Sequence, residues 1–172
     1  IFSTFHSLIL RPLPFEDPTT LHTLWQERNG GQLATGPSAG LVRHLVEQGD
    51  VFEELAAYAV VEHSLAGHGE PVMLTGAEIT ASMSAVLGVE PLIGRTFADE
   101  DIRHNAPVVL LSEAVWRSRF GSSDAVLGTP IRLGPDTRTV IGVMPARFSR
   151  YQDHGRPHEY WLPLDWSRAR FG

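Results

Sequence analysis

The chain has 172 residues, of which 42% are hydrophobic, so it is long and apolar enough for one domain or two small subdomains with a buried core. That apolar content excludes intrinsic disorder, and the net charge of −6 is the wrong sign for a protein that binds nucleic acid phosphates. The chain contains no cysteine, which excludes disulfides, thiolate metal sites and cysteine nucleophiles. Its 14 basic residues are scattered arginines, without a run that would bind anionic lipids.

The N-terminal segment is apolar at first and then rich in proline. Residues 1–10 are far shorter than the roughly 20 apolar residues that a spanning helix needs, so they are either the outer end of a transmembrane helix or an ordinary core helix. Because the chain begins at Ile1 and not at Met, we expect a fragment or a processed product. Three prolines within residues 11–18 predict a rigid, extended segment.

The following part of the chain predicts one strand and two helices. Residues 21–27 have the pattern of a strand, and the glycine-rich stretch 29–38 predicts a loop. Helices are expected over 39–48 and 51–57, each with a capping residue before it.

Two strands and a helix are predicted next. The strands cover 60–65 and 71–79, and the turn at 67–69 joins them, so we expect His63 beside that turn to face solvent. Thr80 is the expected cap of a helix over 81–87, which ends at a glycine.

A buried strand followed by a capped helix is the clearest local signal. The continuous apolar run 107–111 is typical of a strand buried on both faces. Ser112 has the position of an N-cap for a helix over 113–120, and Leu111 and Trp116 have the spacing of a hydrophobic staple.

The last elements are strands. Residues 131–133 and 138–143 predict a hairpin around 134–137, and 160–164 predict a final short strand. Because Pro130 begins the first of these strands, we expect an edge strand there. The mixed order of helices and strands predicts an α+β fold.

None of the candidate catalytic or binding patterns is complete. No glycine-rich loop joins a strand to a helix, so a nucleotide site is not expected. The acidic run 99–101 lacks calcium-loop spacing, and a solvated turn explains it. Ser112 lacks the flanking glycines of a nucleophile elbow, and N-capping explains it fully.

Two histidines in one loop form the remaining metal or catalytic candidate. His154 and His158 have the spacing that aligns two imidazoles on a helix, as zinc sites use. Gly155 and Pro157 oppose a helix there, which leaves only a loop site. From the residues alone, the chain therefore predicts an α+β domain without an assembled active site, a bound metal or a cofactor.

Four stretches taken together resemble the MacB-like periplasmic core domain of FtsX-type ABC-transporter permeases, in the form found in acidobacterial-type permeases. They are residues 8–15, 87–101, 108–121 and 140–164, and their order and spacing both match. The motif positions, which we expect to be structural and not catalytic, are Arg11, Pro12, Gly88, Pro91, Gly94, Arg95, Phe97, Ser112, Trp116, Phe120, Gly121, Gly142 and Pro145.

The resemblance implies a division into subdomains. Residues 1–13 would be the end of the first transmembrane helix and the segment that leaves the membrane. Residues 14–91 with 160–172 would form a porter-like α/β subdomain, and 92–159 an inserted, strand-rich, sabre-like lobe. The family's domain continues into a further βαβ unit that this chain lacks, so the porter-like part is expected to be incomplete.

The resemblance also implies a function. The chain would be an extracytoplasmic coupling module of a permease, located at the periplasmic or outer face of the inner membrane, with no catalysis and no cofactor of its own. Its partners would be an ABC-type ATPase, a second permease copy and a periplasmic adaptor or cargo. Two alternatives from other classes are a small hydrolase with a histidine-containing loop site and an extracytoplasmic solute-binding or sensor domain.

Overall fold

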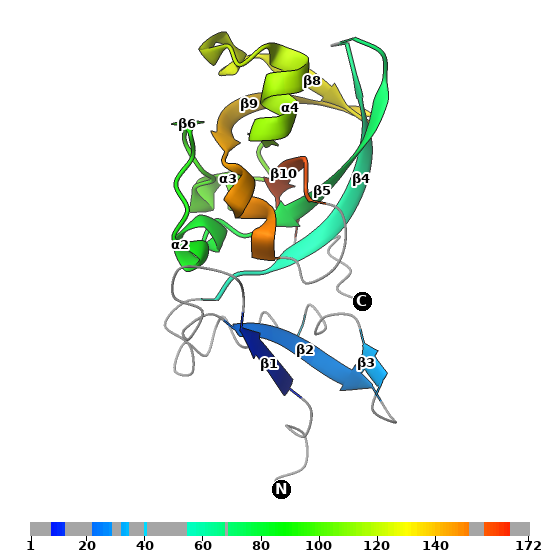
Figure 1. Cartoon of the computed structure of the whole chain (residues 1–172), viewed down its shortest axis with the longest axis vertical. Helices are drawn as coiled ribbons and strands as arrows, with labels where there is room; N and C mark the ends of the chain where they lie inside the picture. Colours follow the sequence, from blue (N-terminus) through cyan, green and yellow to red (C-terminus); the bar gives the residue numbers. More distant parts are fainter. Residues whose placement is uncertain are drawn as a thin grey trace, which may run out of the picture.

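A computed structural model describes residues 8–12, 22–28, 32–34, 40, 55–67, 69–151 and 157–165 (Figure 1). These residues form two sheets, one of three strands and one of seven, together with short helices. The mixed content of helix and strand confirms the predicted α+β class. Among the described residues, no helix is both long and apolar enough to cross a membrane.

The smaller sheet contains the first three strands of the chain. Strands β1 (Leu8–Pro12), β2 (His22–Arg28) and β3 (Gln32–Ala34) pair antiparallel in that order. The strand predicted at 21–27 is confirmed as β2. The helix expected up to residue 10 is wrong over β1, because pairing with β2 satisfies its backbone and proline favours an extended chain there. β3 lies inside the predicted loop, where pairing with β2 overrides the local composition.

The larger sheet closes on itself. Its strands follow the order β6-β9-β7-β10-β5-β4-β8, and β8 also pairs with β9. Six strands therefore form a closed ring, which we call the barrel, and β6 extends β9 outside it. The strands are β4 (Tyr58–Ala66), β5 (Val72–Ile79), β6 (Ile93–Gly94), β7 (Val108–Ser112), β8 (Pro130–Leu133), β9 (Asp136–Met144) and β10 (Tyr160–Pro163).

Two hydrophobic cores lie on the two faces of this sheet. The inner core takes buried side chains from all six ring strands, and Val115 and Val126 complete it from helix α4 (Glu113–Phe120) and the 3-10 helix η1 (Asp124–Val126). The outer core includes Phe148 and Trp161, whose rings meet edge to face with centroids 4.9 Å apart. It lies beneath α2 (Met83–Leu87), α3 (Asp99–Arg103) and the 3-10 helix η2 (Ala146–Tyr151).

The strand period explains how one apolar run serves both cores. On β7, Leu110 belongs to the outer core and Leu111 to the inner core. On β10, Trp161 faces outward and Tyr160 inward. Because neighbouring side chains point to opposite faces, a strand buried on both sides has a continuous apolar sequence, as predicted for 107–111.

Several other predicted elements are confirmed with adjusted boundaries. The strands at 60–65 and 71–79 are β4 and β5, the hairpin at 131–143 is β8 and β9, and 160–164 is β10. The helix over 113–120 is α4.

The predictions for α2 and for residues 51–57 need correction. α2 begins at Met83 and not at 81, and its N-cap residue is Ser82, whose side chain makes no capping bond. The Oγ1 atom of Thr80 instead accepts a hydrogen bond from the backbone of Ala57 at 3.1 Å. Residues 55–57 are not helical, and the rest of that expected helix and nearly all of the one at 39–48 lie outside the described residues.

The expectation of an edge strand at Pro130 is also wrong. β8 pairs with β9 on one side and with β4 on the other. The β4 pairing involves only Arg132 and Leu133, so Pro130 sits at the first residue of the strand, where no donor toward β4 is required.

The chain enters and leaves the barrel at one place. Tyr58, the first residue of β4, and Pro163, the last of β10, both pair with Ile79 on β5. Just outside these strands, Ala57 and Leu164 are buried against each other in a small cluster of their own.

The barrel also crosses the subdomain boundaries that the resemblance implied. β4, β5 and β10 come from the part expected to be porter-like, and β6 to β9 come from the part expected to be an inserted lobe. Boundaries at 91/92 and 159/160 therefore separate strands that are hydrogen-bonded neighbours in one sheet. The existence of two subdomains stays a prediction.

Candidate functional site

Ser112 is placed as the sequence predicts. It ends β7 as the N-cap of α4, and its Oγ accepts a hydrogen bond from the backbone of Val115 at 3.2 Å. Leu111 and Trp116, the predicted staple pair, both pack in the inner core, with Trp116 at its rim. Gly121 ends the helix with φ of 61°. Ser112 therefore stabilises a helix start.

The acidic run at 99–101 forms helix α3 and not a solvated turn. Asp101 is buried, and its carboxylate accepts hydrogen bonds from Arg95 at 2.6 and 3.3 Å and from the backbone of Ala98 at 2.8 Å. The hydrogen bond from Arg95 is the main cause that holds the pKa of Asp101 below its usual value. The carboxylate thus joins the loop after β6 to helix α3. This ion pair was not predicted from the sequence, although Arg95 and Asp101 lie only six residues apart.

The histidine loop is described only in part. His154 lies outside the described residues, and His158 is buried just before β10. The His158 carbonyl accepts a hydrogen bond from Ser149 at 3.0 Å, and its ring meets that of Tyr58 edge to face. Burial lowers the pKa of His158 to about 4, so its imidazole is neutral near pH 7. Among the described residues, no group of three His, Asp or Glu side chains is placed to hold a metal ion.

The structure brings together one polar pair that the sequence did not predict. His63, expected to face solvent beside a turn, lies within β4, and its Nδ1 is 2.7 Å from the hydroxyl oxygen of Tyr160. Tyr160 is fully buried inside the barrel and its ring lies over Gly76. The two residues are 97 positions apart, and no local pattern signals their contact.

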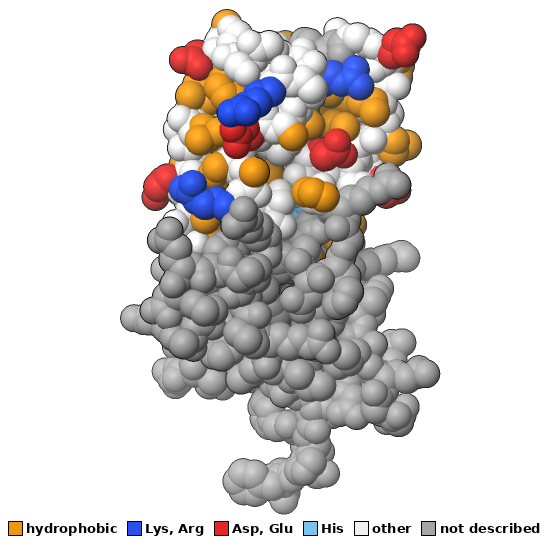
Figure 2. All heavy atoms as spheres, viewed as in Figure 1, with side chains coloured by type: hydrophobic (Ala, Val, Ile, Leu, Met, Phe, Trp, Pro, Cys, Tyr) orange, Lys and Arg blue, Asp and Glu red, His pale blue; other side chains and the backbone are white. Residues whose placement is uncertain are grey.

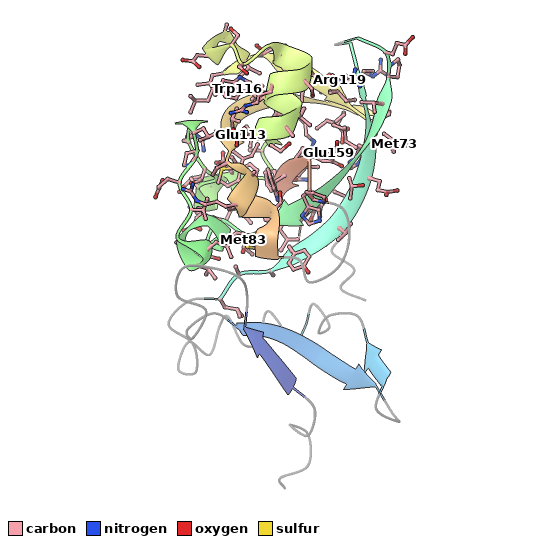
Figure 3. The ribbon with its side chains drawn as sticks, viewed as in Figure 1. Met73, Met83, Glu113, Trp116, Arg119 and Glu159 are labelled. Carbon is pink, nitrogen blue, oxygen red and sulfur yellow. The ribbon has the colours of Figure 1, made fainter. Side chains whose placement is uncertain are left out.

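Helix α4 presents a mixed surface. Figure 3 shows Glu113, Trp116 and Arg119 projecting from it, with Arg119 on the side of the β4–β5 hairpin, where its Nη1 donates to the Glu70 carbonyl at 3.3 Å. Arg117 pairs with Glu113 at 2.5 Å. On the face seen in Figure 2, basic, acidic and hydrophobic side chains are interspersed, an arrangement that does not favour a ligand of one charge.

The motif positions that the structure describes lie mainly at ends and contacts of elements. Gly94 on β6 and Gly142 on β9 are register partners. A Cβ on Gly94 would overlap the backbone carbonyl oxygen of Ile141 on β9, and a Cβ on Gly142 would overlap that of Arg95, the residue after β6. This pair therefore allows β6 to approach β9 closely.

The described residues thus form a strand-rich domain in which Ser112, Asp101 and His63 make hydrogen bonds that stabilise the fold. The chain belongs to the family of MacB-like periplasmic core domains, whose model matches residues 2–172. No curated protein sequence matches the chain significantly.

Two solved structures share this fold. The extracellular domain of the noncanonic ABC-type transporter YknZ from Gram-positive bacteria is 21% identical, with a TM-score of 0.59 over 74% of this chain and 62% of that one. The periplasmic region of MacB from Actinobacillus actinomycetemcomitans is 15% identical, with a TM-score of 0.63 over 81% of this chain and 62% of that one. The chain thus spans about three fifths of the length of these relatives.

Proposed function

We propose that this chain is the periplasmic domain of an ABC-transporter permease, and that it couples ATP hydrolysis by a separate ATPase to substrate export or to force transmission in the cell envelope. The observation that carries the proposal is the family match over residues 2–172. The proposed partners are the ATPase, a second permease copy, and a periplasmic adaptor or cargo.

The contacts inside the domain give several of its polar side chains a structural role. Ser112 caps a helix, Asp101 joins α3 to Arg95, and His63 bonds to Tyr160. Ser112 and Asp101, two of the groups considered as catalytic or binding candidates, thus stabilise the fold. We further propose that the barrel, and not residues 92–159 alone, is the strand-rich lobe, because its strands form one closed sheet.

The location can be tested by cysteine labelling, since the chain contains no cysteine of its own. In the full-length parent protein, freed of other cysteines, Val60→Cys places a thiol on β4 at a position 60% exposed. The matched control is Val109→Cys, at a position 0% exposed. We expect a membrane-impermeant maleimide to label Val60→Cys in intact spheroplasts and Val109→Cys only after denaturation. Labelling of Val60→Cys only after lysis would overturn the periplasmic location.

The coupling can be tested with a nitroxide on the same Val60→Cys in the transporter assembled with its ATPase. Pulsed electron paramagnetic resonance then gives the distance between labels on two permease copies. We expect the distance distribution to change between the nucleotide-free and ATP-trapped states. An unchanged distribution in a transporter that still hydrolyses ATP would refute coupling through this domain.

A further inference from the structure

The barrel is closed by a short contact between two hairpins. β4 pairs with β5 over eight register pairs, and β8 pairs with β9 along its whole length. Between the hairpins, β4 and β8 share two register pairs, Leu65 with Leu133 and Ala66 with Arg132. Opening the barrel at this contact, which we call the seam, leaves both hairpins intact. The seam is therefore a place where local opening breaks few hydrogen bonds and keeps both hairpins intact.

His63 lies at the seam. Its neighbour Ser64 accepts a hydrogen bond from the backbone of Gly134, in the β8–β9 turn, at 2.8 Å. The imidazole packs against the same turn, because a Cβ on Gly134 would be only 2.9 Å from Cδ2 of His63. The ring thus fills the space between β4 and the turn that follows β8.

The hydrogen bond of His63 suits the neutral ring. With Nδ1 unprotonated, the Tyr160 hydroxyl donates to it across 2.7 Å. A protonated ring donates from Nδ1, so the hydroxyl must accept and send its own proton elsewhere. The other described acceptor is the Val61 carbonyl at 3.5 Å, which is too long for a good bond. Protonation therefore reverses the short bond inside the barrel and leaves the hydroxyl proton with a poor acceptor.

The surroundings act in the same direction. Burial, and then the positive charge of Arg138 on β9, lower the pKa of His63, and Asp136 opposes them. Burial is also the main cause that raises the pKa of Tyr160, so the phenol keeps its proton. Three acidic residues on β4, on β5 and just before β10 add to that rise, and they are Glu62, Glu78 and Glu159.

We propose that the contact between β4 and β8 is an acid-sensitive seam, at which protonation of His63 reverses its bond with Tyr160 and allows the two hairpins to separate. The inference does not depend on the proposed function. It gives the barrel a closed state near neutral pH and a locally opened state in acid.

Amide hydrogen exchange on the 172-residue chain tests the seam. The reporter is the Gly134 amide, bonded across the seam, and the reference is the Ser112 amide, bonded to the Glu159 carbonyl at 2.9 Å on the other side of the barrel. Between pH 7.5 and 5.0, corrected for intrinsic exchange, we expect the opening constant of Gly134 to rise relative to that of Ser112. Binding of one proton below the ordinary histidine pKa can raise the opening constant by up to about tenfold per pH unit, which amounts to about 30-fold at pH 5.0.

The matched control is His63→Gln, whose amide oxygen can accept from the Tyr160 hydroxyl and does not titrate. We expect its ratio of opening constants to be independent of pH. An unchanged ratio in the wild type, or an equal rise in His63→Gln, would overturn the proposal.

A second measurement applies if His63→Gln does not fold. In the wild type, the opening constant of Gly134 must rise below the ordinary histidine pKa and level off at the ring pKa of His63 in the closed domain, which NMR measures. A rise that levels off instead at the ring pKa of His158 also overturns the proposal.

Discussion

Replacing Gly76 by alanine tests the packing inside the barrel most directly. A Cβ at this position would lie 2.5 Å from Cζ of Tyr160 and 2.6 and 2.7 Å from the two Cε atoms. The new methyl group would therefore meet the hydroxyl-bearing end of the ring. Ordinary contacts between carbon atoms are about 3.5 to 4.0 Å, so the ring has to move by about 1 Å. Tyr160 is fully buried and its hydroxyl is bonded to His63, and both facts oppose this movement.

We expect Gly76→Ala to lower the free energy of unfolding by about 3 kcal/mol. Overpacking of a dense core costs about 1 to 3 kcal/mol, and displacing the ring also weakens the His63 hydrogen bond, worth about 1 kcal/mol. Urea unfolding at pH 7.5, followed by tryptophan fluorescence, measures the change, because Trp161 lies next to Tyr160 on β10.

The control variant is Tyr160→Leu, which removes the ring that the methyl group would meet. In that background, Gly76→Ala should cost less than about 1 kcal/mol, so the two substitutions should be strongly non-additive. A loss below about 0.5 kcal/mol in the wild type, or an equal loss in both backgrounds, would refute the reasoning.

Two further predictions concern buried ionisable groups. Asp101→Asn should lower stability by about 1 to 2 kcal/mol at pH 7, because it weakens the bonds to Arg95 and to the Ala98 amide. Because the pKa of Asp101 is depressed, the stabilisation by its carboxylate is complete above the ordinary pKa and is lost as pH falls through the pKa in the folded state. If urea unfolding showed Asp101→Asn still less stable than the wild type at pH 2, this reasoning would be contradicted. Burial lowers the pKa of His158 from 6.5 to about 4, so wild-type stability should fall relative to His158→Gln by on the order of 3 kcal/mol as pH drops between those values. A difference that is constant from pH 7.5 to 4.5 would show that His158 is not desolvated.

Local signals predicted the elements that depend on neighbouring residues. The run 107–111 is buried on both faces as its composition indicates, and Ser112 caps α4 because a hydroxyl at a helix start satisfies a free amide. The β8–β9 hairpin follows from a turn whose first residue, Gly134, has φ of 58°. In each case the determining contact spans only a few positions.

The closure of the barrel could not be predicted in the same way. β4 and β8 are joined through pairs such as Leu65 with Leu133, which are 68 positions apart, and a strand pattern does not specify its partner. The contact of His63 with Tyr160 could not be predicted for the same reason, because 97 positions separate the two residues in the sequence. The same reason explains why the expected boundary after residue 91 crosses one sheet, since motif positions locate segments and not their pairing.

The contact between Ala57 and Leu164 determines how the domain would bear a mechanical load. Because the chain enters the barrel at Tyr58 and leaves it at Pro163, both paired with Ile79, a pull on the flanking chain acts first on these neighbouring strand ends. β4 and β10 would be peeled from opposite edges of β5, one hydrogen bond at a time, while the other strands of the ring carried little tension. The same adjacency of ends suits a unit that is inserted in another fold without separating its two halves.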